Sequence, residues 1–175
     1  MRRKLTLAVV LIGISISCTK QSTPTNSPSA STSPGVSQTR NSVDVVKVST
    51  TITEIKRNQT ADALVQLTID KGYHVNANPP TFPYLKATEV ELQPTPDISV
   101  SFIVYPDPIT KQFEFADKPL AVYEGTTTIK VRLKANKSAQ PGPRNLSGKL
   151  RVQACDEQVC YAPGTLDVTL PLDIK

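Results

Sequence analysis

Apolar and polar residues alternate along most of the chain after about residue 43, as they do in strands with one buried face. The clearest run sets Ile129, Val131, Leu133 and Ala135 against charged residues between them. Similar same-face sets are Ala63/Val65/Leu67/Ile69, Ile98/Val100/Phe102/Val104, Leu150/Val152/Ala154 and Leu166/Val168/Leu170/Leu172/Ile174. Helical periodicity is absent, and the segments between the runs are rich in the turn-forming residues Pro, Gly, Asn and Asp. Eight or so short strands in about 130 residues predict an all-β, antiparallel β-sandwich.

The N-terminus is typical of an export signal. Met1–Lys4 is positively charged, and residues 5–16 form an apolar run that is too short for a bilayer span of about 20 residues. The run ends at Ser15-Ile16-Ser17-Cys18, which resembles a bacterial lipobox, although Ser15 stands where leucine is usual. We predict a lipoprotein-type signal peptide at 1–17 and a lipid on Cys18; the alternative is ordinary cleavage nearby. Either way the mature chain reaches an oxidising compartment.

Residues 18–42 are dominated by Ser, Thr, Pro, Asn and Gln. Such a segment buries too little apolar surface to offset the entropy of ordering, so it should be a disordered tether. The folded domain should then span 43–175. The net charge of +5 falls close to neutral once Arg2, Arg3 and Lys4 leave with the signal, and no basic cluster is interleaved with aromatics. We therefore expect no nucleic-acid partner.

Two cysteines remain in the domain, Cys155 and Cys160, framed by strand-like runs. A hairpin that brings the thiols together near its turn is the simplest interpretation. If Ala154 faces the core, Cys155 should face outward. A disulfide that closes a six-residue ring contributes only about 2 kcal/mol, which favours an exchangeable bond over a structural staple, but the staple stays open.

The neighbours of the two thiols differ. Asp156 and Glu157 should raise the pKa of the Cys155 thiol, so Cys160 is the better attacking group. A metal site would have three ligands at most, the two cysteines and the sole histidine, His74. We expect neither a metal nor another cofactor.

The stretch 155–163 resembles the active-site hairpin of the N-terminal periplasmic domain of the DsbD family of thiol:disulfide interchange proteins. The segments 71–80, 84–92 and 119–125 are similar to the same family in the same order, so the resemblance covers nearly all of 43–175. One departure is Ala162, which replaces the first of two prolines often found after the second cysteine.

This resemblance implies an immunoglobulin-like sandwich and an oxidoreductase role in thiol–disulfide exchange. By position, Cys160 resembles the cysteine that forms the mixed disulfide and Cys155 the one that resolves it. The family also has a cap loop, for which 112–117 is the equivalent. Phe115, or failing that Phe113, is the candidate shield. The remaining candidates near the active site are Tyr161, His74 and Asn76.

The resemblance also implies thioredoxin-like periplasmic partners. Neither a transmembrane electron-conducting domain nor a Cys-x-x-Cys thioredoxin-like domain follows in this sequence, so we expect a membrane electron carrier or another thiol donor to act in trans. The expected location is the periplasmic side of the cell envelope, with a membrane anchor at Cys18. The rival hypothesis is a non-catalytic β-sandwich lipoprotein in which the cysteine pair is a staple.

Overall fold

The computed structural model describes residues 40–175. The predicted signal peptide, the lipidation site Cys18 and most of the predicted tether lie outside the described residues. The described part contains twelve strands and one turn of 3-10 helix. No helix within 40–175 is long and apolar enough to cross a membrane.

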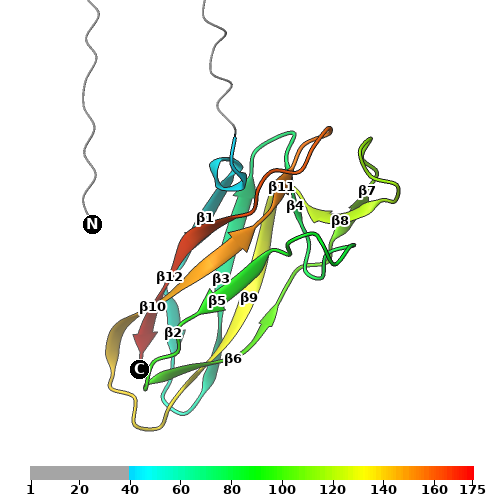
Figure 1. The fold of residues 1–175 in the computed structure, drawn as a ribbon. Coiled ribbons are helices and arrows are strands. Elements are labelled where there is room, and N and C mark those ends of the chain that lie inside the picture. The colour runs from blue at the N-terminus through cyan, green and yellow to red at the C-terminus, as the bar shows by residue number, and fades with distance from the viewer. Residues whose placement is uncertain (1–39) are drawn as a thin grey trace, which may run out of the picture. The chain divides into compact units, whose positions relative to one another are not determined.

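The strands form three four-stranded sheets (Figure 1). The first has the order β1-β3-β9-β6, the second β2-β12-β10-β5 and the third β11-β4-β8-β7. The elements are η1 (Ser42–Val45), β1 (Val46–Thr50), β2 (Thr53–Ile55), β3 (Thr60–Ile69), β4 (His74–Asn76), β5 (Glu89–Leu92), β6 (Ile98–Val104), β7 (Ile109–Lys111), β8 (Leu120–Tyr123), β9 (Thr126–Ala135), β10 (Gly142–Val152), β11 (Ala154–Cys155) and β12 (Gly164–Ile174). All pairings are antiparallel except that of β12 with the short strand β2.

The first two sheets enclose one main hydrophobic core, which draws on both. In β9 the predicted inward residues, from Ile129 to Ala135, are fully buried while Lys130 and Lys134 between them are exposed. The same alternation holds in β3, β10 and β12. This confirms the predicted immunoglobulin-like β-sandwich, because the period-two pattern matches two sheets that bury one face each.

One strand departs from its predicted facing. In β6 Phe102 and Val104 are exposed, although the pattern placed them on one face with the buried Ile98. The pairing of β6 with β9 shifts between Val100 and Phe102, so an extra residue reverses which side chains face inward. Phe102 then packs under the guanidinium of Arg132, 5.2 Å from its ring centre.

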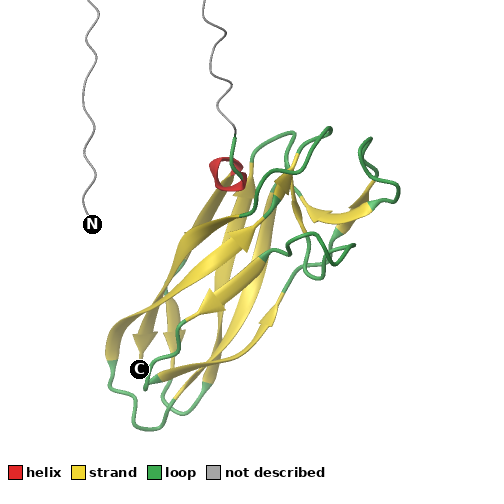
Figure 2. Ribbon diagram, in the orientation of Figure 1, coloured by secondary structure: helices red, strands yellow, loops and turns green. Residues whose placement is uncertain are grey.

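The third sheet lies at one end of the sandwich, where its short strands are joined by long loops (Figure 2). One face of it, with Val75, Tyr123 and Ala154, packs on the main core. The opposite face carries a separate group that we call the second core cluster. Its members are Phe113, Leu120 and Val122, with Phe82, Leu85 and Ala116 partly buried against them. Both faces of this sheet are therefore covered.

The chain enters the third sheet at Gln153, between β10 and β11, where it leaves one sheet for another. The Gln153 side chain stabilises that transition: its Oε1 accepts hydrogen bonds from Asn76 Nδ2 (3.0 Å) and the Lys86 backbone (2.7 Å). Its Nε2 donates to the carbonyl of Tyr161 at 3.2 Å. This residue thus positions the start of the hairpin that carries both cysteines.

Candidate functional site

The two cysteines lie on a short hairpin and are joined by a disulfide. Their Cα atoms are 3.9 Å apart, and Cys155 and Cys160 pair as an isolated antiparallel bridge. The Asp156 N–H donates to the carbonyl of Val159 (3.0 Å), which closes the turn. The Tyr161 N–H donates to the carbonyl of Ala154 (2.8 Å), one residue outside the cysteine pair on each arm. The predicted hairpin and its thiol pair are therefore present.

Asp156 fastens the turn with both carboxylate oxygens. Oδ1 accepts hydrogen bonds from the backbone of Gln158 (2.8 Å) and Val159 (2.9 Å), and Oδ2 accepts one from the hydroxyl of Tyr161. Partial burial opposes ionisation of Asp156, but these hydrogen bonds outweigh it and lower the pKa of the carboxyl. The bond to Asp156 is also the main reason that the pKa of Tyr161 rises to about 12.

The two sulfur-bearing residues differ in exposure. Cys160 is partly exposed, whereas Cys155 is fully buried. The prediction that Cys155 faces solvent is therefore wrong. Successive strand residues face opposite sides, so Cys155 does face away from Ala154 and the main core. That side is not open to water, because the second core cluster covers this face of the third sheet.

His74 lies directly opposite Cys155 in the ladder between β4 and β11, and it is almost fully buried. Its Nε2 is 2.9 Å from Glu124 Oε2 and 3.0 Å from Lys111 Nζ, and Lys111 also donates to Glu157 at 2.6 Å. Its Nδ1 is buried without a hydrogen-bond partner. Directly opposite residues of a sheet share a face, so the imidazole is a neighbour of Cys155.

Asn76 is the next residue on the same face of β4, and it is completely buried. Its backbone N–H and its side-chain Nδ2 both bond to Gln153, at 3.1 and 3.0 Å. Asn76 therefore reaches the cysteine hairpin through Gln153, at the point where the chain changes sheets.

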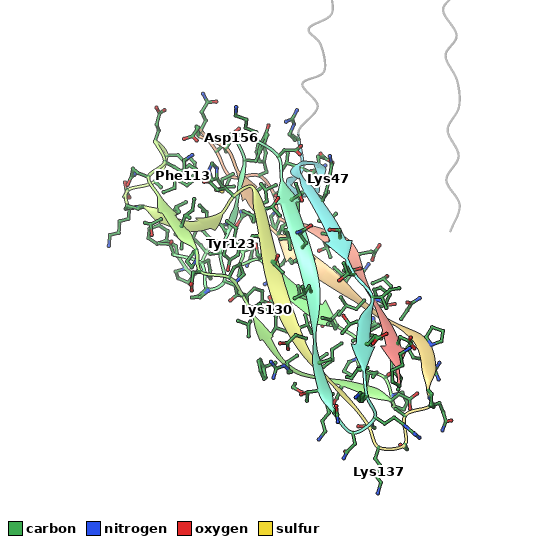
Figure 3. The ribbon with its side chains drawn as sticks, turned by 180° about the vertical axis from the view of Figure 1, so that it is seen from behind. Lys47, Phe113, Tyr123, Lys130, Lys137 and Asp156 are labelled. Atoms are coloured by element: carbon green, nitrogen blue, oxygen red, sulfur yellow. A yellow bond between two sulfur atoms is a disulfide. The ribbon has the colours of Figure 1, made fainter. Side chains whose placement is uncertain are left out.

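The two candidate shield residues occupy different places. Phe115 is 40% exposed and lines an open groove of about 260 Å³ beside Cys160. Phe113 is buried in the second core cluster, where its ring and that of His74 form a T-shaped pair with ring centres 5.3 Å apart. Figure 3 shows Phe113 at the same end of the domain as Asp156. The other lining residues of the groove are Tyr84, Leu85, Ala116, Leu120, Gln158 and Val159. Cys160 thus lies at the edge of an apolar surface to which Phe115, in the segment 112–117, contributes its ring.

Several residues that build the site give no signal in the sequence. Ser42, the last residue of the predicted tether, is fully buried; its Oγ donates to the carbonyl of Ala162 (2.6 Å) and accepts from the N–H of Ala154 (2.9 Å). It therefore bridges the two arms of the hairpin. Lys111, the last residue of β7, and Glu124, the residue after β8, reach His74 from far away in the chain, and no local pattern marks them.

Comparison with known proteins places this geometry in a family. Residues 42–172 match the family model described as thiol:disulfide interchange protein DsbD, N-terminal. The chain belongs to this family. The chain carries a disulfide hairpin on an immunoglobulin-like sandwich, and the family to which it belongs is one of thiol:disulfide interchange proteins.

Comparison with solved structures finds two similar domains, the first of which shares the fold. The N-terminal periplasmic domain of ScsB from Proteus mirabilis is 22% identical, with a TM-score of 0.52 over 74% of this chain and 47% of that one. The chain therefore spans about half the length of that relative. The DsbD N-terminal domain of Neisseria meningitidis, in the reduced form, is 16% identical, with a TM-score of 0.41 over 67% of this chain and 82% of that one. A search of curated protein sequences gives no match.

Proposed function

We propose that this domain carries reducing equivalents to thioredoxin-like proteins of the bacterial cell envelope, with Cys160 as the attacking thiol and Cys155 as the resolving thiol. The observation that supports these roles is the unequal exposure of the pair. Cys160 is partly exposed beside an apolar groove, whereas Cys155 is fully buried. An incoming disulfide can approach Cys160 from solvent but not the buried Cys155, and the bond between the two cysteines places Cys155 within reach of Cys160.

The exchange runs in two steps. In the reduced domain the Cys160 thiolate attacks one sulfur of the partner's disulfide, a mixed disulfide forms, and the other partner sulfur leaves as a thiolate. Cys155 then attacks Cys160, which breaks the mixed disulfide and releases the second partner thiolate. The partner gains two electrons, and the domain returns to the disulfide form. A separate thiol donor, which we propose to be a membrane electron carrier supplied in trans, reduces it again.

We propose that the partner binds in the groove beside Cys160. Tyr84 is 71% and Val159 49% exposed, so apolar surface stays open to solvent around the reacting sulfur. We assign the shield role to Phe115, because it lines this groove, and a packing role to Phe113. In this proposal the partner displaces the partly exposed ring of Phe115 as it docks.

The proposal extends to the parts of the chain before the domain. We propose that 1–17 is a lipoprotein-type signal peptide, that Cys18 carries the lipid anchor, and that the segment up to about residue 42 tethers the domain 43–175 on the periplasmic side of a membrane. A tether of this kind would let the domain meet both a membrane donor and mobile partners.

Trapping of a mixed disulfide tests the function. The full chain with Cys155→Ser should form an adduct with an oxidised thioredoxin-like periplasmic protein that a reducing agent releases, because nothing resolves the bond to Cys160. The matched control, Cys160→Ser, keeps only the buried thiol of the pair, beside the proposed lipid-bearing Cys18, and should form none. Failure of both variants would support the rival hypothesis, a staple in a non-catalytic lipoprotein. Equal trapping by both variants would overturn the assignment of roles.

A further inference from the structure

We propose that His74 takes the proton from Cys155 when this buried thiol resolves the mixed disulfide. The inference rests on the proposed function, since it concerns the second step of that exchange. It addresses a difficulty that burial creates. Only the thiolate attacks a disulfide, and a thiol in apolar surroundings resists ionisation, so Cys155 needs a base beside it.

The backbone places a base there. His74 and Cys155 are directly opposite in the antiparallel ladder, on the face of the third sheet that turns away from the main core. Side chains at such positions start from Cβ atoms about 4.5–5.5 Å apart. Both side chains are buried on the same side of the sheet, so a proton can pass between them without bulk water.

The hydrogen bonds of His74 leave one nitrogen for this task. Glu124 Oε2 lies 2.9 Å from Nε2, and a carboxylate accepts only from a protonated ring nitrogen. Neutral His74 then carries its hydrogen on Nε2 and a lone pair on Nδ1. Nδ1 is buried and has no partner in this disulfide form of the domain. Reduction creates a donor, the S–H of Cys155, next to this unpaired acceptor.

The charged groups around His74 come from several elements. Glu124 follows β8, Lys111 ends β7, Glu157 belongs to the cysteine hairpin, and Asp70 and Lys71 line the same hollow beside the ring. The Lys111 ammonium lies 3.0 Å from Nε2 but already donates to Glu157 at 2.6 Å. Glu124 would therefore offset the charge of a protonated imidazole, whereas Lys111 would oppose it.

The proposed step balances as follows. The proton of Cys155 moves to Nδ1 of His74, and the electron pair left on Cys155 Sγ forms the bond to Cys160 Sγ. The bond from Cys160 to the partner breaks, and its electron pair leaves on the partner sulfur. The imidazolium, paired with Glu124, later returns its proton to solvent or to the released thiolate.

Stopped-flow mixing of the reduced full chain with an aromatic disulfide that releases a coloured thiolate separates the two steps. The first phase depends on reagent concentration and reports attack by Cys160. The second is independent of it and reports resolution by Cys155. His74→Gln keeps a donor for Glu124 but has no basic nitrogen, so its second phase should be at least tenfold slower at pH 7. The deficit should shrink as the pH rises, because hydroxide then ionises a growing fraction of the buried Cys155 thiol without help from His74.

Variants of Glu124 and Lys111 test the proposal with less risk of unfolding the domain, because both of these side chains are partly exposed. Glu124→Gln removes the carboxylate that keeps the hydrogen on Nε2 and lets Lys111 donate there instead, so the second phase should slow. Lys111→Gln removes a charge that opposes the imidazolium, so the second phase should not slow. Unchanged pH profiles in His74→Gln, or equal slowing by both milder variants, would overturn the proposal. Absence of the first phase in the unaltered chain would instead count against the proposed function.

Discussion

Replacement of Ser42 by alanine should destabilise the domain through the cysteine hairpin. The Ser42 hydroxyl joins the two arms of this hairpin, donating to Ala162 and accepting from the buried N–H of Ala154. Ala162 is exposed, so water can replace the lost donor at its carbonyl. Ala154 is fully buried, and its N–H would be left unpaired.

The size of the effect follows from that unpaired donor. A buried N–H without a partner costs about 1–3 kcal/mol, so we expect a loss of about 2 kcal/mol in the free energy of unfolding. Unfolding entropy near the midpoint is about 2.1 cal/mol/K per residue, which for this domain converts the loss into a Tm about 7 °C lower.

Thermal unfolding followed by circular dichroism measures this shift. Ser49→Ala is the matched control: Ser49 is exposed, and its hydroxyl makes one long bond of 3.3 Å to Gln66. A surface change of this kind should stay within about 0.5 kcal/mol. Equal melting temperatures for the two alanine variants would refute the stabilising role of the Ser42 hydroxyl, and with it the view that the folded domain includes Ser42.

Two further predictions concern the surroundings of the disulfide. Phe115→Ala should speed the reaction of Cys160 with a small disulfide severalfold and leave the stability of the domain nearly unchanged. Phe113→Ala should leave a cavity and lower the free energy of unfolding, measured with denaturant, by about 3–5 kcal/mol. A larger loss of stability for Phe115→Ala, or a larger gain in rate for Phe113→Ala, would contradict the assigned roles. Asp156→Asn should return the Tyr161 pKa from about 12 toward 10, read from its resolved NMR signal. Because folding lowers the pKa of Asp156, this carboxylate stabilises the domain above about pH 4, and the stabilisation is lost as the pH falls through the pKa of the folded state. The stability of Asp156→Asn should therefore lack this dependence on acidic pH. An unchanged Tyr161 titration in Asp156→Asn would argue against the hydrogen bond between the two side chains.

The alternation of residues was enough to predict the sandwich, because the strands β3, β9, β10 and β12 each bury one face over most of their length. The prediction from alternation failed in β6, because a shift in register turns Phe102 to the opposite face, and the sequence of apolar and polar residues does not reveal that shift. A binary pattern records which residues are apolar, but it does not record where a ladder gains a residue.

The site was only partly predictable for a related reason. The disulfide hairpin is local, so the spacing of Cys155 and Cys160 was enough to find it. The burial of Cys155 depends on a cluster contributed by residues 82–122, which covers a face that the local pattern assigns to solvent. The partners of His74 and the role of Ser42 depend on contacts between residues far apart in sequence, and those become visible only in the folded chain.

The reduction potential of the Cys155–Cys160 pair tests the central claim most directly. The bond closes a six-residue ring, which stabilises the fold by only about 2 kcal/mol, and Cys160 is partly exposed. Equilibration of the full chain with thiol–disulfide buffers of known potential should give a value within about −120 to −270 mV, the range of proteins that exchange disulfides. A value well below about −300 mV, typical of structural disulfides, would contradict the account.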